Sequence, residues 1–172
     1  DDLLEGGEGA DELDGGEGEN TLSYGSSKVG VSISLENNTA SGGDATGDRF
    51  KNFVNLGGSE FDDVLIGNEK DNHINGEGGD DEIHGRGGDD NLFGAKGDDK
   101  IYGEGGDDTL TGFEGPDYMD GGDGKDTASY AHPYATGGVD VDLTEGKGSE
   151  GFAEGDIYVS IENVLGSKYK DT

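Results

Sequence analysis

One apolar residue recurs at every ninth position through the middle of the chain. It lies at the centre of three residues that suit a short β-strand, and the six residues before these three are rich in Gly and Asp and suit a turn. Because successive strand side chains point to opposite faces, the central residue points inward. The pattern predicts a solenoid of turns and short strands with a core of Leu65, Ile74, Ile83, Leu92, Ile101, Leu110, Met119 and Ala128.

Residues 58–129 divide into eight nine-residue lines of the form G-x-x-G-x-D-x-U-x, where U is apolar. The most regular lines are Gly76–His84, Gly85–Phe93 and Gly103–Thr111. We interpret the glycines at positions 1 and 4 as residues that adopt backbone angles closed to other residues. Two lines are expected to form one coil, so that residues 18 apart stack in one sheet. The inner columns are then Leu65/Ile83/Ile101/Met119 and Ile74/Leu92/Leu110/Ala128.

This nonapeptide is similar to the calcium-binding repeat of the RTX family of secreted bacterial proteins, and the likeness covers most of the chain. The resemblance implies a calcium-binding parallel β-helix. We therefore expect an all-β protein, a right-handed parallel β-roll (β-solenoid) in blocks that are joined by β-rich inserts.

A longer repeat lies over the nonapeptides. Residues 11–24 (DELDGGEGENTLSY) match residues 117–130 (DYMDGGDGKDTASY) at an offset of 106, and residues 31–35 match residues 139–143 at an offset of 108. The chain begins and ends inside a nonapeptide, so we expect it to be a segment of a longer tandem array. The predicted organisation is the end of a block (1–23), an insert (24–57), a block of eight nonapeptides (58–129), a second insert (130–165) and the start of a further block (166–172).

Each insert has its own apolar pattern. A strand with clean alternation comes first, followed by a Gly- and Asp-rich loop and a second apolar stretch; the two strands are Val31/Ile33/Leu35 and Val139/Val141/Leu143. About 35 residues rarely bury a core alone, so we expect the inserts to form wider solenoid coils that pack on the ends of the rolls.

The composition is strongly acidic. Forty-one Asp and Glu against eleven Lys and Arg give a net charge of −30, and 37 of 172 residues are Gly. With 28% hydrophobic residues, the chain suits either a flexible acidic tail or a fold that cations stabilise, and the regular period favours the fold. The charge argues against nucleic acid and anionic membrane surfaces as partners. The chain has no Cys for disulfides, and no run approaches the roughly 20 apolar residues needed for membrane insertion.

Position 6 of the repeat places acidic side chains in two further columns, Asp63/Asp81/Asp99/Asp117 and Asn72/Asp90/Asp108/Asp126. Neighbouring strands lie about 4.8 Å apart. Carboxylates at that spacing repel one another by about 1 kcal/mol even in water. A hard cation with six to eight oxygen ligands, Ca²⁺, fits between them, and carbonyls of the Gly turns complete its shell. We therefore expect several Ca²⁺ per chain, with folding coupled to their binding.

The resemblance also implies a ligand set, in which each Ca²⁺ lies between one turn and the turn two repeats later. The first turn gives the carbonyls of positions 2 and 4, the second gives those of positions 1 and 3, and both give the position-6 carboxylate. Carried onto this chain, the carboxylate ligands are Asp63, Asp81, Asp90, Asp99, Asp108, Asp117 and Asp126. The implied carbonyl ligands are Gly76, Glu77, Gly78, Gly79, Gly85, Arg86, Gly87, Gly88, Gly94, Ala95, Lys96, Gly97, Gly103, Glu104, Gly105, Gly106, Gly112, Glu114, Gly121 and Asp123.

The first two nonapeptides depart from this pattern. Phe61 and Lys70 replace the position-4 Gly, and Asn72 replaces the position-6 Asp. We expect the sites that begin there to be weaker.

The remaining candidate residues each have a functional and a plainer interpretation. The position-5 Asp residues are expected to face solvent as solubility charges. In the insert loops, Asp44, Asp48 and Asp156 either bind further calcium or serve ordinary turns. Outward aromatic residues either contact a saccharide or cover the sheet surface; they are Phe93, Tyr102, Tyr130 and Tyr134.

We find no pattern of catalytic residues. His73 and His84 fall on opposite sheets and, with His132, are expected to lie on the surface. No Ser/His/Asp set, HExxH motif or phosphate-binding loop occurs, so the chain is not expected to be an enzyme.

RTX proteins leave the cell unfolded through type I secretion and fold on meeting external calcium, and the resemblance implies the same route. We expect a secreted or cell-surface location, with calcium ions and neighbouring repeat blocks as partners. The favoured function is a structural, stiffening segment of an adhesin, S-layer or similar giant repeat protein. The alternative is an accessory calcium-binding and secretion domain of a secreted enzyme or toxin. The 108-residue repeat favours the first.

Overall fold

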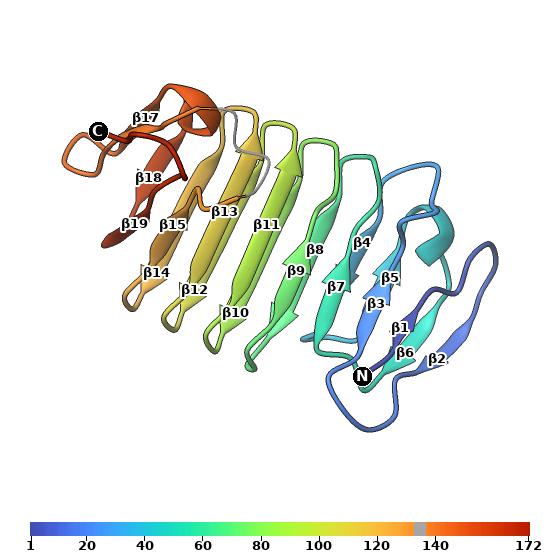
Figure 1. The fold of residues 1–172 in the computed structure, drawn as a ribbon. Coiled ribbons are helices and arrows are strands. Elements are labelled where there is room, and N and C mark those ends of the chain that lie inside the picture. The colour runs from blue at the N-terminus through green and yellow to red at the C-terminus, as the bar shows by residue number, and fades with distance from the viewer. Residues whose placement is uncertain (133–136) are drawn as a thin grey trace.

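The computed structural model describes residues 1–132 and 137–172, and the chain winds as a flattened solenoid with its termini at opposite ends of the row of strands (Figure 1). The first sheet is parallel and contains, in spatial order, β1 (Leu3–Leu4), β3 (Thr21–Ser23), β7 (Asn55–Gly57), β9 (His73–Asn75), β11 (Asn91–Lys96), β13 (Thr109–Glu114), β15 (Thr127–Ser129) and β19 (Asn163–Leu165).

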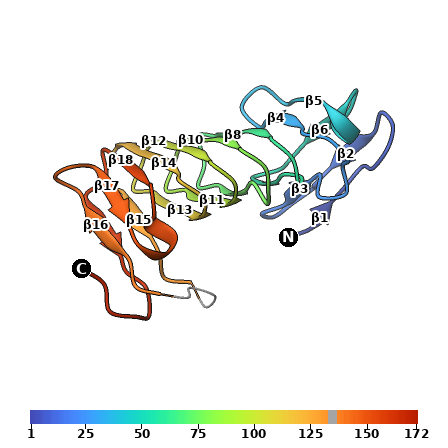
Figure 2. The same ribbon diagram turned by 90° about the horizontal axis from the view of Figure 1, so that it is seen from above.

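A second sheet lies opposite, as the turned view shows (Figure 2). Its order is β16 (Asp140–Asp142), β17 (Lys147–Ser149), β18 (Ile157–Val159), β14 (Tyr118–Asp123), β12 (Lys100–Gly105), β10 (Glu82–Gly87), β8 (Val64–Asn68), β4 (Ser32–Ser34) and β5 (Thr39–Ser41). A separate parallel pair consists of β2 (Glu12–Asp14) and β6 (Arg49–Lys51). Short 3₁₀ helices in the described residues are η1 (Gly43–Ala45) and η2 (Gly151–Ala153).

The register confirms the predicted coil of two nonapeptides. Ile83 pairs with Ile101 in the second sheet, and Leu92 pairs with Leu110 in the first. The fold is the expected all-β parallel β-roll. Strands in the middle of the block are longer than the three residues predicted, because pairing continues past the apolar position into positions 1–3 of the next nonapeptide, as in β10 and β12. The turn is correspondingly shorter.

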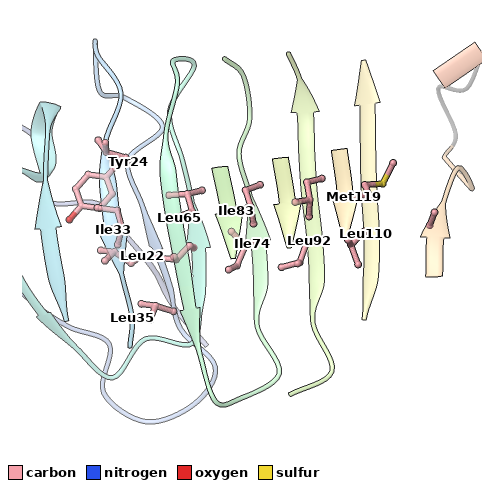
Figure 3. Close-up of a cluster of buried hydrophobic side chains, with 14 of the residues drawn as sticks. Leu22, Tyr24, Ile33, Leu35, Leu65, Ile74, Ile83, Leu92, Leu110 and Met119 are labelled. Carbon is pink, nitrogen blue, oxygen red and sulfur yellow. The ribbon is translucent and has the colours of Figure 1, made fainter. Parts of the chain in front are cut away.

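The apolar columns form the core between the two sheets (Figure 3). The side chains are fully buried at every position-8 residue, namely Leu65, Ile74, Ile83, Leu92, Ile101, Leu110, Met119 and Ala128. Each buried aliphatic side chain contributes about 1.5–3 kcal/mol. One such side chain per nine residues is a thin core, so the turns have to contribute to stability as well.

The inserts continue the solenoid on one side and interrupt it on the other. In the first sheet, β7 pairs with both β3 and β9, so this sheet runs through the first insert without a break. On the opposite side β6 pairs with β2, β4 pairs with β8, and β5 forms an antiparallel hairpin with β4. The second insert repeats the arrangement, since β18 pairs with β14, β19 with β15, and β16 with β17.

The inserts share the core of the roll. Leu22, Tyr24, Val31, Ile33, Phe50 and Phe53 of the first are buried in the same cluster as the position-8 residues. Because strand pairing crosses both junctions, the division into blocks and inserts remains a sequence-based proposal. In the described ranges, no helix is long and apolar enough to span a bilayer.

Candidate calcium sites

The turns of the last six nonapeptides share one backbone conformation. Position 4 is a glycine with positive φ, between 101° and 152°, at Gly79, Gly88, Gly97, Gly106, Gly115 and Gly124. Position 2 is also left-handed, although all but the last of its residues carry a side chain: Glu77, Arg86, Ala95, Glu104, Phe113 and Gly122. A side chain there costs about 1–2 kcal/mol. The backbone interpretation therefore holds for position 4.

For position 1 that interpretation was wrong. None of the position-1 glycines from Gly76 to Gly121 has a positive φ. They are required because a methyl group on any of them would lie within 2.5 Å of the position-6 Oδ2 of the same repeat. On Gly76 or Gly85 it would also lie 2.8 Å from the carbonyl oxygen of Gly94 or Gly103, respectively. The glycine thus leaves a small space between a carboxylate and a carbonyl of the next coil.

The position-6 carboxylates form a ladder along each edge of the roll. The Oδ1 atom of each accepts the backbone N–H of the position-6 residue 18 earlier, at 2.7–3.0 Å. The side chain of Asp99, for example, binds the amide of Asp81, and the side chain of Asp117 binds the amide of Asp99. These bonds hold every carboxylate in one orientation and stack the turns in register.

From the third nonapeptide on, the second oxygen of each of these carboxylates has no hydrogen-bond partner among the described residues. These Oδ2 atoms are buried and face the space beside the position-1 glycine; they belong to Asp81, Asp90, Asp99, Asp108, Asp117 and Asp126. The residues themselves are at most 2% exposed. A buried charged oxygen without a partner is strongly unfavourable. Two columns of them indicate an arrangement that takes a ligand.

Burial raises the pKa values of these carboxyl groups. In the metal-free chain desolvation raises the pKa of Asp81 and Asp117 to about 8, and that of Asp90 to about 7. For Asp99 and Asp108 it raises the pKa to about 6. The hydrogen bond from the neighbouring amide opposes this shift without cancelling it. Each carboxylate therefore needs a proton or a cation.

The donor set fits calcium. In the described part of the chain no three His, Cys, Asp or Glu side chains converge as a metal cluster, so a cation here depends on backbone carbonyls as well as carboxylates. An all-oxygen set assembled from two turns suits Ca²⁺, which accepts irregular shells. Of the implied ligands, the structure brings the carbonyls of Gly94, Gly103 and Gly121 to the carboxylates of Asp81, Asp90 and Asp108, respectively. The ligands implied at positions 2–4 lie in the same turns, and their roles stay predictions.

Two position-6 residues near the first insert differ. Asp63 has both oxygens occupied, by the amide and hydroxyl of Ser59 and the amide of Val31. Asn72 donates its side-chain amide to the carbonyl of Val54 and accepts from the amide of Asn68. Neither turn has a left-handed residue at position 2 or 4. Weaker calcium sites in these two turns stay a prediction.

Asp11 was missed by sequence reasoning. Its Oδ2 atom is buried without a partner, like those of the block. The signal was present, because Asp11 matches Asp117 at the 106-residue offset.

Two of the three candidate carboxylates in the insert loops, Asp48 and Asp156, are satisfied within the chain. Asp48 accepts the amide of Asp11 at 2.8 Å and the hydroxyl of Tyr24 at 3.0 Å. Asp156 accepts the amide of Asp117 at 2.9 Å and the hydroxyl of Tyr130. Both therefore extend the position-6 ladder into the inserts, with a tyrosine on the second oxygen. For Asp44, the structure shows only its amide bound to Ser27 Oγ.

The position-5 residues are exposed as predicted, yet they also form a ladder. The carboxylates of Asp62, Asp71, Asp80, Asp89 and Asp107 each accept the backbone N–H of the position-5 residue 18 later, at 2.9–3.0 Å. Asp98 is opposite Pro116, which has no N–H to donate. The sequence predicted the exposed position-5 carboxylates but not the hydrogen bonds that they accept from the next coil.

The histidines lie on opposite sheets, as predicted, and join rows of aromatic side chains. His73 packs 4.9 Å from Phe93 on the first sheet, and His84 stacks 4.8 Å from Tyr102 on the second. A groove lined in part by His73, Phe93 and Phe113 follows the first sheet. Tyr130, which was expected to face outward, is buried and donates its hydroxyl to Asp156, so that expectation was wrong. Contact of the other aromatics with a saccharide remains a prediction, and Tyr134 lies outside the described residues.

The comparisons agree with this geometry. No curated protein matches the chain. The family model described as RTX calcium-binding nonapeptide repeat (4 copies) matches residues 1–26, 57–92 and 93–128, which together are more than half of the chain. These segments contain the position-6 columns and their turns. The chain therefore belongs to the RTX calcium-binding nonapeptide repeat family.

Proposed function

We propose that this chain is a calcium-dependent stiffening segment of a large secreted or cell-surface repeat protein, and that it folds on meeting external Ca²⁺. The observation that carries the proposal is the double column of buried carboxylate oxygens without partners. Each lies beside a glycine at which a methyl group would cover the oxygen. Protons or cations have to neutralise these columns, and Ca²⁺ is the hard cation that accepts an irregular shell of carboxylate and carbonyl oxygens.

From the ligand set that the family resemblance implies, we infer one ion between the turns of Asp81 and Asp99, and a second between those of Asp90 and Asp108. Further ions lie between Asp99 and Asp117 and between Asp108 and Asp126. Bound there, Ca²⁺ supplies positive charge and links two coils. The chain's own contribution is the amide ladder that fixes the carboxylates.

Calcium binding of this kind is coupled to folding. The unfolded chain cannot hold carbonyls and carboxylates of two turns together, so the binding free energy becomes folding free energy. Extracellular calcium modules have Kd values on the order of 10⁻⁴–10⁻³ M. Such a module stays unfolded at low intracellular calcium and folds after export, which supports the type I secretion route.

The strand pairing supports a stiffening segment over an accessory domain of an enzyme or toxin. The first sheet continues through the first insert, and β2–β6 is repeated 106 to 108 residues later as β14–β18. Because the strand pairing at one end of the unit recurs at the other end, further copies of the unit can be added in tandem through the same kind of contact. The termini at opposite ends of the row suit this arrangement (Figure 1).

Far-UV circular dichroism of the chain in chelator, and then in rising Ca²⁺, tests the proposal. We expect a largely unfolded spectrum in chelator and a gain of β-structure with calcium. Mg²⁺ at equal concentration should not substitute, because it requires octahedral geometry near 2.0–2.1 Å and retains its waters. A folded spectrum in chelator would contradict the proposal, and an equal magnesium midpoint would show that charge screening, not coordination, drives folding.

A further inference from the structure

The junction between the block and the second insert contains the same kind of space as the block itself. A methyl group on Gly121 would lie within 2.5 Å of both Asp126 Oδ2 and the carbonyl oxygen of Ser160. Asp126 is fully buried, and its Oδ2 has no partner. The carbonyl of Ser160, an insert residue, thus takes the place that a position-1 glycine carbonyl has in the block.

The insert is held firmly against this space. The amides of Glu162 and Asn163 both donate to the carbonyl of Asp126, at 3.1 and 2.9 Å. In return, the Glu162 carboxylate accepts the amide of Asp126 at 2.9 Å. Ser160 has a φ of 50°, a left-handed conformation that is unusual for a residue with a side chain. The junction therefore brings two carboxylates and a carbonyl together with no cationic side chain hydrogen-bonded to Asp126 or Glu162 in the described residues.

The first insert provides an internal comparison. Its Asn20, Asn52 and Val54 take the places of Asp126, Ser160 and Glu162, respectively. Asn20 keeps the ladder bond, accepting the amide of Asp2 at 2.9 Å. Its side-chain nitrogen donates to the carbonyl of Asn52 at 3.1 Å. The first junction therefore fills the space with an amide nitrogen.

Asn20 also identifies further oxygens around this space. Its side-chain nitrogen lies 3.4 Å from the carbonyl oxygens of both Glu17 and Gly18. The corresponding residues in the second junction are Asp123 and Gly124, at the 106-residue offset. Where the first junction has an N–H donor surrounded by carbonyls, the second has a carboxylate oxygen in its place.

We propose that the second junction binds one additional Ca²⁺ through the Asp126 and Glu162 carboxylates and the carbonyls of Ser160, Asp123 and Gly124, and that the Asn20 side chain replaces this ion at the first junction. An all-oxygen set of this size suits Ca²⁺. The ion ties the insert to the block, so the calcium column extends beyond the nonapeptides at one junction and ends before the other. This rests on the proposed calcium binding of the block.

Native mass spectrometry of the whole chain in calcium, with the number of bound ions as readout, tests the proposal. Asn20→Asp with Val54→Glu gives the first junction the acidic residues of the second, and we expect one ion more than in the unmodified chain. Glu162→Val removes the insert carboxylate and keeps Asp126 for the block site that it shares with Asp108, and we expect one ion fewer. Asn38→Asp, in the exposed turn between β4 and β5, adds one negative charge outside any such space and should leave the number unchanged.

The outcomes separate this inference from the proposed function. If the unmodified chain binds several ions and the folded gain variant binds no more, the junction site is wrong while the function stands. If the gain variant does not fold, an unchanged ion count in the loss variant overturns the inference. If the unmodified chain binds no calcium, the proposed function itself fails.

Discussion

The nonapeptide coils and the insert coils differ in what binds the second oxygen of a buried carboxylate. Both place a buried carboxylate at the same edge of the roll, with one oxygen bound to the amide of the neighbouring coil. In the block the second oxygen has no partner, as at Asp99. In the inserts a tyrosine hydroxyl binds it, as Tyr24 does at Asp48.

This difference shows which part of the fold depends on an external ion. A tyrosine hydroxyl that the chain itself supplies satisfies Asp48 and Asp156 without an external ion. The block carboxylates depend on protons or calcium, so a chain in chelator at neutral pH retains the repulsion of the columns. The same ladder therefore combines carboxylates that need a proton or a calcium ion with carboxylates that a tyrosine already satisfies.

Acidification in chelator should partly replace calcium, and this is the largest effect we expect because it acts on every block carboxylate at once. Burial raises the pKa of Asp81 and Asp117 to about 8 in the folded chain, from an ordinary value of 3.8. The folded state then holds protons that the unfolded chain releases, so the stability is present at low pH and is lost as the pH rises towards 8. Circular dichroism between pH 5 and 8 measures this.

Salt is the control for acidification, since it screens exposed charges and leaves buried carboxylates as they are. The net charge of −30 makes this control necessary. If high salt at pH 8 restores as much β-structure as pH 5, general charge repulsion and not protonation of the columns governs folding.

Asp99→Ala should raise the calcium midpoint by about tenfold or more, while Asp98→Ala changes it little. Asp99 binds the amide of Asp81, and a hydrogen bond to a charged group contributes about 1.5–3 kcal/mol. It is also the carboxylate that two stacked sites would share. The exposed Asp98 is opposite Pro116, so its carboxylate lacks even the position-5 bond. Circular dichroism during a calcium titration measures the two midpoints. Equal midpoints for the two variants would contradict the assignment of position 6, and not position 5, as the calcium ligand.

Tyr24→Phe should turn an insert carboxylate into one of the block type. It leaves Asp48 Oδ2 buried without its partner, at a cost of about 1–3 kcal/mol. Urea unfolding in saturating calcium measures the loss. Tyr102→Phe removes a hydroxyl from the outer face of the second sheet and is the matched control. A loss no greater than that of the control would show that the hydroxyl does not stabilise Asp48.

Ala95→Gly should produce the smallest effect, a stabilisation of about 0.5 kcal/mol. Ala95 has a φ of 83°, which costs about 1–2 kcal/mol for a residue with a side chain, and part of the gain is lost to the greater freedom of glycine in the unfolded chain. Ala40→Gly in the first insert has no such strain to relieve and should destabilise by about 0.5–1 kcal/mol. Urea midpoints in calcium compare the two, and the same sign for both would contradict this account of the turn.

Much of the fold follows from the period. Position 8 recurs every nine residues and two nonapeptides form one coil. The sequence alone therefore places Ile83 and Ile101, which are 18 residues apart, in one column. The position-6 columns follow for the same reason. The role of the position-1 glycine did not follow, because a glycine needed for space and one needed for its backbone angle look alike in a sequence.

Local pattern determined the all-β coil, its register and the residues that face the core, because each depends on contacts at a constant separation of 18 residues. Only the tertiary structure decided how each carboxylate is satisfied. Tyr24 is 24 residues from Asp48, and Asp156 is 39 residues from Asp117, and neither separation is a multiple of nine. Hydrogen bonds across an insert depend on how its loop folds back, and that geometry arises when the inserts pack on the roll.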